Sequence, residues 1–413
     1  MLQNILKNYK SLDRNIKNAL AAQFSVQAIN SAFFLLLNYF MTEVGYEDFQ
    51  IADVLSYRFL AVCLLAFPLG LYIRGRRLLP MFWVAVIGVS ILSHLLILAI
   101  LDGDIWLVKS LSMVWGFVYV FIQVAIMPYI LLNSPREQHS EAIALSFLSL
   151  GGTIFIVGTV YTLLSFMSVP IDEKMTLQVV ATMSLFFGVF FLSKIKGREN
   201  LSEKIPFSEV AASYDWWIIL KAIAPTVLIA IGAGFTIPVI NLFFYHVHGV
   251  PSETFAALGS ATWLLVIVVM LLIPAIRRKF GYKVAITLFQ SLSIIALFGL
   301  AATEWIQAWE GAVVLAGIFY VLRQPLMSAA APMASELTMY LVGEKNQEIM
   351  AALNASVWSG SWFVSTGIFS MLRKAEWAYS SIFMFTVAFY VIGVAWYGHL
   401  IRLYEQSKAS SAL

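Results

Sequence analysis

The sequence predicts an all-α membrane protein with about twelve transmembrane helices in two pseudo-symmetric six-helix bundles. Of its 413 residues, 61% are hydrophobic and only 12% are charged. Soluble domains are near half apolar and a quarter charged, so a chain this apolar belongs in lipid. A basic turn that recurs half a chain length later indicates the two halves.

The repeated turn follows the second apolar run of each half. Its first copy, PLGLYIRGRR, occupies residues 68–77, and its second, PAIRRKFGYK, occupies residues 274–283. The glycines Gly75 and Gly281 are 206 positions apart (281 − 75), as are the first and last residues of the two copies. Because this spacing is far longer than a solenoid repeat, it indicates a duplicated bundle.

Apolar runs of about 20 residues, the length that crosses a bilayer, predict the individual helices. We expect them at 19–42, 50–73, 79–101, 106–132, 141–167, 175–195, 217–245, 253–276, 283–302, 311–341, 347–371 and 377–401. The expected domains are an N-terminal segment 1–18, a bundle 19–195, a linker 196–215, a bundle 216–402 and a tail 403–413. Segment 1–18 lacks an apolar core and does not resemble a cleavable signal peptide.

The loop charges predict the orientation of the chain in the membrane. Lysines and arginines concentrate in the first segment, the even-numbered loops and the C-terminal tail, whereas the opposite loops hold only Lys174, Arg373 and Lys374. Positive loops stay inside, so we expect both termini and the linker in the cytoplasm. We expect a monomeric, multi-pass protein of the cytoplasmic (inner) membrane, because its loops are short.

The two halves, the midpoint linker and the repeated turn resemble the major facilitator superfamily over the whole chain. The loop pattern of that family is roughly Gly-x-x-x-Asp-Arg-x-Gly-Arg-Arg/Lys. The residues that match its end, which the resemblance marks as conformational-switch loops, are Gly75, Arg76, Arg77, Gly281 and Lys283. Prolines replace the first glycine in both copies, and Tyr72 and Arg278 replace the acid. The resemblance therefore does not extend to the latch that this acid forms in the family.

Within that family, the small multidrug and metabolite exporters are the branch that the chain resembles more than the sugar transporters. The run GAGFTIPVINLFF and the proline-rich run that contains Glu336 carry this resemblance. Two antiporter features are missing: SFLSLGGTIFIVG has no Gly-Pro motif, and Ser112 stands where the arginine of the fourth helix would be.

Polar residues inside the apolar runs suggest a central cavity. Stripes at helical spacing in the first, fourth and eleventh runs share single helix faces, and the resemblance places the first, fourth, seventh and tenth helices around the cavity. The cavity candidates are Gln27, Asn30, Asn38, Arg58, Tyr119, Gln123, Asn241, Arg323, Gln324, Asn354 and Trp358. The alternative for each neutral residue is a hydrogen bond to a neighbouring helix, worth roughly 0.6 kcal/mol.

The charged residues inside the runs separate two kinds of site. Arg58 lies too deep to reach water easily, so it either binds an anionic solute or is neutralised by a carboxylate of another helix. Glu336 is the first proton-coupling candidate and Asp53 the second, because a buried carboxylate takes up a proton more readily than an exposed one. For Glu336 the alternative is a salt bridge between helices. Arg323 lies beside Pro325, where a bent helix can border a cavity.

These features predict a secondary active transporter of a small organic solute by alternating access, and proton-coupled export of a drug or metabolite, as an antiporter, is the leading hypothesis. The alternative is uptake or exchange of an anionic metabolite or phosphate ester bound by Arg58 and Arg323. An enzyme or scaffold is the remote alternative, because no nucleophile–base pair or phosphate-binding loop is present. With one cysteine and scattered histidines, we expect no metal, cofactor or nucleic acid, and only the solute, protons and lipid as partners.

Overall fold

The computed structural model describes residues 12–73, 75–135, 138–197, 199–201, 215–343 and 346–410. Over these residues the chain is helical between short turns and has no strand. The predicted all-α class is therefore correct. Eleven of the described helical segments are long and apolar enough to cross a membrane.

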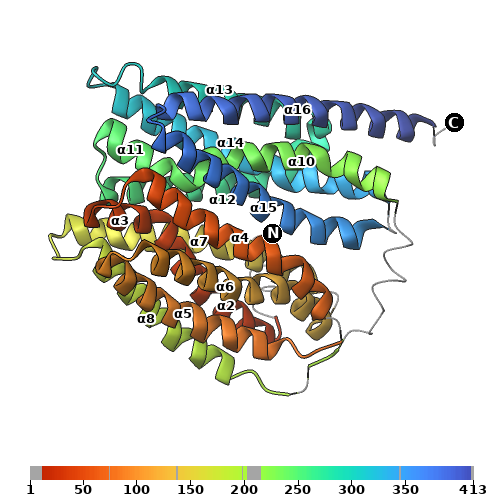
Figure 1. Ribbon diagram of the computed structural model, residues 1–413. Coiled ribbons are helices and arrows are strands. Elements are labelled where there is room, and N and C mark those ends of the chain that lie inside the picture. The colour runs from red at the N-terminus through yellow and green to blue at the C-terminus, as the bar shows by residue number, and fades with distance from the viewer. Residues whose placement is uncertain are drawn as a thin grey trace. The chain divides into compact units, whose positions relative to one another are not determined.

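The described residues of the first half form six helical rods (Figure 1). The first rod is continuous through a π-helical stretch and consists of α2 (Arg14–Ala32), η1 (Phe33–Leu37) and α3 (Asn38–Val44). The others are α4 (Asp48–Tyr72), α5 (Leu79–Asp102), α6 (Ile105–Asn133), α7 (His139–Phe166) and α8 (Glu173–Ser193).

The second half supplies six more rods, two of which are interrupted. The first consists of α10 (Trp216–Thr236), the 3-10 turn η3 (Ile237–Val239) and α11 (Ile240–His248). The next are α12 (Ser252–Tyr282) and the pair η4 (Lys283–Leu288) and α13 (Phe289–Ala302). The last are α14 (Ala312–Val342), α15 (Gln347–Lys374) and α16 (Tyr379–Ser410). The break at η3 contains Pro238, whose ring cannot continue the helical hydrogen-bond ladder.

Several boundaries differ from the sequence prediction for physical reasons. The first helix begins at Arg14 rather than residue 19, because Asp13 caps it by accepting from the backbone N–H groups of Asn15 and Ile16. The last helix continues to Ser410, into the predicted tail. The eleventh predicted span, 347–371, corresponds to α15, which is helical but is not among the eleven apolar spans, since its sequence is rich in polar residues.

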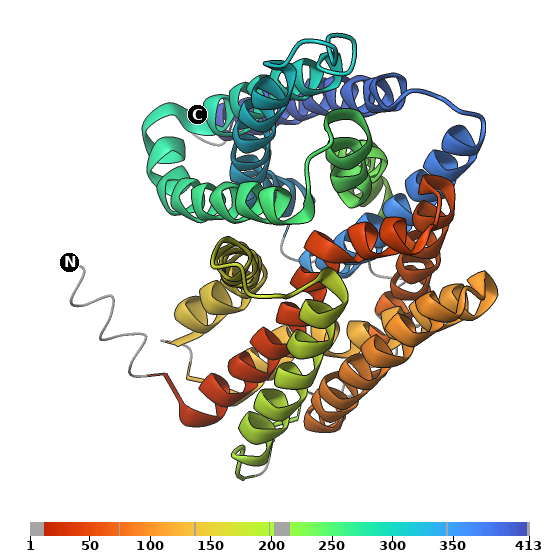
Figure 2. The same cartoon turned by 90° about the vertical axis from the view of Figure 1, so that its left-hand side faces the viewer.

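The chain divides into two compact units. The first contains the described residues up to Tyr46 and those from Tyr57 to 201, and the second contains Glu47–Ser56 and the described residues from Asp215 onward. In the first unit α2 packs against α7 and α8 and α5 packs against α6 (Figure 2). In the second unit α16 packs beside both α10 and α13, and α14 packs against α12 and α13.

Both copies of the basic turn place their glycine in the left-handed region. Gly75 has φ 67° and Gly281 has φ 75°, a backbone conformation that residues with a Cβ rarely adopt. In the first copy the Arg76 guanidinium donates to the Tyr72 hydroxyl (3.0 Å) and lies over its ring. Tyr72, which stands in place of the family's acid, thus binds Arg76 through a hydrogen bond and a cation–π contact rather than an ion pair.

The start of the linker is fastened to the first unit. The Glu199 carboxylate accepts from the N–H groups of Leu78 (2.6 Å) and Leu79 (2.9 Å) at the start of α5. The Asn200 amide nitrogen donates to the carbonyl of Leu132 (2.8 Å), and Lys196 exchanges two hydrogen bonds with the side chain of Asn15. A carboxylate at a helix N-terminus satisfies its unpaired N–H groups and complements its dipole.

Candidate functional site

A half-buried arginine, Arg58, lies at the centre of a polar cluster in the first unit. The Arg58 side chain of α4 donates from Nη2 to the Asn30 Oδ1 of α2 (2.7 Å). Its guanidinium carbon lies 4.3 Å from the centroid of the Trp115 ring of α6. Two helices, α2 and α6, thus place neutral groups, an amide and an aromatic face, around the cation of α4.

The cluster continues as a chain of hydrogen bonds from α2 to α6. The Gln27 Oε1 accepts from the Asn30 Nδ2 (3.4 Å) and from the Tyr119 hydroxyl (3.0 Å). The Tyr119 hydroxyl in turn accepts from the Gln123 amide one helical turn later. Four of the cavity candidates, Gln27, Asn30, Tyr119 and Gln123, therefore share one hydrogen-bond network with Arg58.

Trp115 fixes the position of this network, and sequence reasoning missed it. The ring is fully buried, stacks between Phe33 and Tyr119, and donates from Nε1 to the Ser93 hydroxyl (2.9 Å). Beside it, Gly116 permits close approach of α4, because a Cβ there would lie 2.5 Å from the Arg58 carbonyl oxygen. The available signal was the spacing: Trp115 precedes Tyr119 by four residues and so shares its helix face.

The second unit contains the other predicted arginine, Arg323 of α14, which is fully buried. Its Nη1 donates to the Gln324 Oε1 (3.1 Å) and its Nη2 to the Tyr390 hydroxyl of α16 (3.3 Å). Its Nε is buried and has no hydrogen-bond partner among the described residues. The Ser293 hydroxyl of α13 binds the Arg323 carbonyl (3.0 Å) and fixes the backbone at this point.

The contacts of the two arginines with other described residues are all to uncharged groups. In the described part of the chain, the hydrogen bonds and ring contacts of Arg58 and Arg323 all involve uncharged groups. Of the two alternatives for Arg58, these contacts favour an anionic solute over a carboxylate of another helix. Asp53 and Glu336, the two proton-coupling candidates, are half-buried on α4 and α14.

The remaining cavity candidates are not hydrogen-bonded to either arginine within the described residues. Asn38 and Asn241 are buried, and the Asn241 Oδ1 accepts from the N–H of Leu242. Asn354 and Trp358 are half-buried on α15. On the same stripe, the Ser365 hydroxyl donates to the Ile231 carbonyl of α10 (2.6 Å), so part of this stripe holds helices together.

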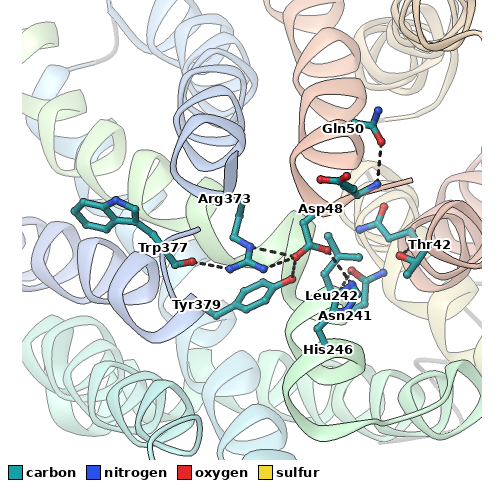
Figure 3. Close-up of polar contacts among 11 residues, drawn as sticks. Thr42, Asp48, Gln50, Asn241, Leu242, His246, Arg373, Trp377 and Tyr379 are labelled. Carbon is teal, nitrogen blue, oxygen red and sulfur yellow. Dashed lines mark hydrogen bonds and ion pairs between the residues drawn. The ribbon is translucent and has the colours of Figure 1, made fainter. Parts of the chain in front are cut away.

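A third polar site, after those of Arg58 and Arg323, lies in the second unit around Asp48, the first residue of α4 (Figure 3). Its Oδ2 accepts from the Arg373 Nε (3.1 Å) and Nη2 (2.8 Å) of α15 and from the Tyr379 hydroxyl of α16 (2.5 Å). Its Oδ1 lies 2.9 Å from the His246 Nε2 of α11. We call these four residues the Asp48 cluster. Asp48 itself is only 8% exposed.

Sequence reasoning treated the members of the Asp48 cluster as loop charges or left them out. They come from three distant parts of the chain, around residues 48, 246 and 373–379, so no local spacing links Asp48 to its partners. The available signal was Arg373, one of the few basic residues on the side of the membrane that positive charges usually avoid. An arginine in such a place suggests a specific acidic partner.

The described residues contain no group of three or more histidine, cysteine, aspartate or glutamate side chains that could hold a metal ion. The fold and its buried polar clusters define a multi-pass membrane protein built from two helical units. The sequence profile described as Major Facilitator Superfamily matches residues 19–366, and the chain belongs to that family. It is therefore a protein of a transporter family and not an enzyme.

Solved transporters share the fold at low sequence identity. A POT family transporter is 11% identical with a TM-score of 0.75, covering 95% of this chain and 98% of its own. A D-xylose–proton symporter is 14% identical with a TM-score of 0.69 (92% and 95% covered). A nucleoside transporter is 14% identical with a TM-score of 0.65 (94% and 98% covered). No curated protein sequence matches the chain significantly.

Proposed function

We propose that this protein is a secondary active transporter that moves a small organic anion across the membrane by alternating access. The observation that carries this proposal is a pair of arginines in membrane helices, half-buried Arg58 and fully buried Arg323, each of which contacts uncharged partners among the described residues. An anionic substrate would supply the countercharge that the described residues do not provide.

The energies allow Arg58 to stay charged in the membrane without a carboxylate partner. An arginine near the centre of a transmembrane helix costs roughly 2.5–3.5 kcal/mol on insertion scales. For Arg58, a charge-assisted hydrogen bond contributes roughly 1.5–3 kcal/mol and a cation–π contact roughly 0.5–2 kcal/mol. The neutral partners can therefore offset the cost of placing the cation in the membrane, but they leave its charge available to an anion.

The surroundings of Arg58 also suit a substrate with a polar, uncharged part. A guanidinium can bind a carboxylate or phosphate through two parallel hydrogen bonds. Gln27, Tyr119 and Gln123 next to it offer amide and hydroxyl groups, which can donate and accept. Uptake or exchange of an anionic metabolite or phosphate ester fits this chemistry better than export of a lipophilic cation, which would favour arginines neutralised by carboxylates.

Net transport against a gradient needs an energy source, and we propose protons, with Glu336 as the first coupling residue and Asp53 as the second. Both carboxylates lie half-buried in membrane helices that also carry an arginine of the proposed site. We further propose that the protein acts as a monomer in the inner membrane with both termini in the cytoplasm. The distribution of loop charges supports this orientation.

The test is ligand-dependent thermal stabilisation of the purified protein. A panel of monocarboxylates, dicarboxylates, phosphate esters, sugars and lipophilic cations would be screened against wild type, Arg58→Gln and Arg323→Gln. Lys109→Gln is the matched control, because it removes one positive charge from a side chain that lies over Trp106 and Tyr57.

We expect an anion to raise the melting temperature of wild type and of the Lys109 variant, but not that of either arginine variant. Stabilisation by a lipophilic cation that both arginine variants retain would contradict the proposal.

A further inference from the structure

The hydrogen bonds around Arg58 all run in one direction, and the arginine sets that direction. A guanidinium has only N–H donors, so the Asn30 atom that faces Arg58 at 2.7 Å is the amide oxygen. The Asn30 nitrogen therefore points to Gln27, whose Oε1 accepts from it (3.4 Å). Neither amide can be turned round without placing N–H groups against N–H groups.

The same direction continues along α6. The Tyr119 oxygen lies 3.0 Å from the Gln27 Oε1, which has no hydrogen to donate, so the Tyr119 hydroxyl donates there. Its oxygen is left as an acceptor, and the Gln123 amide nitrogen donates to it. Because both Asn30 and Tyr119 donate to the Gln27 Oε1, the two lone pairs of that oxygen are occupied inside the network.

The groups that remain unused next to Arg58 are mainly donors. In the described part of the chain, no acceptor binds the amide N–H groups of Gln27, the second N–H of Asn30 or the other N–H groups of Arg58. Asn30 and Arg58 are half-buried, so packing does not close this part of the network. An unused amide oxygen belongs to Gln123, which lies beyond Tyr119 at the exposed end of the network.

This imbalance selects among anions. A donor that leaves water without finding an acceptor costs free energy, so a solute that brings its own N–H groups to Arg58 adds donors where few acceptors are left. Carbonyl, carboxylate and phosphate oxygens would instead accept from the unused N–H groups.

We propose that the substrate is an anion of the keto-acid type, which presents only hydrogen-bond acceptors beside its negative charge, and not an amino acid or an amide. Tyr119 determines this selectivity, because its hydroxyl keeps the Gln27 oxygen occupied. The proposal rests on the proposed function, since it concerns the solute bound at Arg58.

The test compares anions that differ only in their donors. The pairs are pyruvate and oxamate, acetoacetate and malonamate, and levulinate and succinamate. Within each pair the net charge, the carbonyl group and the shape are shared, but the second anion has NH₂ in place of CH₃. Dissociation constants are obtained from the shift in melting temperature of the purified protein as each anion is titrated.

We expect the keto acid of at least one pair to bind wild type about tenfold more tightly than its amide, the effect of a donor without an acceptor. Arg58→Gln should abolish binding of both. In Tyr119→Phe the preference should disappear while the keto acid still binds, because a freed Gln27 lone pair accepts from the amide and the phenyl ring keeps the stacking on Trp115. The matched control is Tyr57→Phe, whose lost hydroxyl has no hydrogen bond among the described residues, and it should keep the preference.

Equal affinity within every pair, or tighter binding of the amides, would overturn the assignment of an acceptor-only substrate. The proposal of an organic anion would survive that result, provided that Arg58→Gln abolishes binding. An undiminished preference in Tyr119→Phe would overturn the role of Tyr119. If no anion binds in a manner that depends on Arg58, the proposed function itself is refuted, and the substrate class with it.

Discussion

Replacement of Gly116 by alanine should push α6 away from α4 at the helical turn that carries Arg58. The new Cβ would lie 2.5 Å from the Arg58 carbonyl oxygen and 3.0 Å from the Ala61 Cβ. Ordinary van der Waals contact begins near 3.4 Å, so the two backbones must separate by most of an ångström. Neither contact is the end of a flexible side chain, and the strain cannot relax by a rotamer change.

The expected cost is that of an overpacked core, about 1–3 kcal/mol. For a unit of about 200 residues, each kcal/mol lowers the melting temperature by about 2–4 °C, so a loss of about 2–12 °C follows. The same shift should lengthen the Arg58–Asn30 hydrogen bond, now 2.7 Å, and weaken binding of an anion. Thermal unfolding in detergent at a fixed scan rate, with and without ligand, measures both effects.

The matched control is Gly70→Ala in the same helix pair. Its new Cβ would lie 3.9 Å from the Val124 Cγ1, an ordinary contact, so stability should change little. If Gly116→Ala and Gly70→Ala melt at the same temperature and bind equally well, the close approach of α4 and α6 is not what fixes Arg58.

Three further predictions concern other parts of the chain. Glu336→Gln should abolish substrate-dependent proton movement in liposomes loaded with a pH dye, and unchanged proton movement would assign the carboxylate a structural role. Glu199→Gln should destabilise the protein by about 0.5–2 kcal/mol in thermal unfolding, since it weakens the cap of α5. Gly234→Ala should lower the melting temperature more than Gly317→Ala. A Cβ at residue 234 would lie 2.7 Å from the Ser365 Cβ, whereas a Cβ at residue 317 would lie 3.6 Å from the end of the flexible Leu258 side chain.

Hydrophobic runs predicted the helices well because each span must satisfy its own backbone in lipid. The ends were less predictable, since they depend on local capping. Asp13 caps the N-terminus of α2, and it lies among polar residues that hydropathy assigns to the N-terminal segment 1–18. The break at Pro238 was readable, because proline has no N–H to donate.

The Arg58 network was predictable because its members repeat along two helix faces. The position of Trp115 beside Arg58 was not predictable, since a tryptophan in a membrane helix can face either the lipid or the neighbouring helices. The Asp48 cluster was beyond sequence reasoning for a different reason. Asp48, His246 and the turn that carries Arg373 and Tyr379 meet only in the folded chain, and no helical spacing relates these three parts.

Glu199 and Asn200 bind the start of α5 and the end of α6. Their position indicates where the chain can be split into two fragments that are expressed from separate genes. A cut before residue 196 would separate the Glu199 carboxylate from the start of α5 and the Asn200 amide from the end of α6. The first fragment would then lose both stabilising contacts. A cut after residue 201 leaves both contacts with the first fragment, and Asp215 still caps α10 in the second. Fragments divided there are the natural pair for co-expression and for measuring how strongly the two units associate.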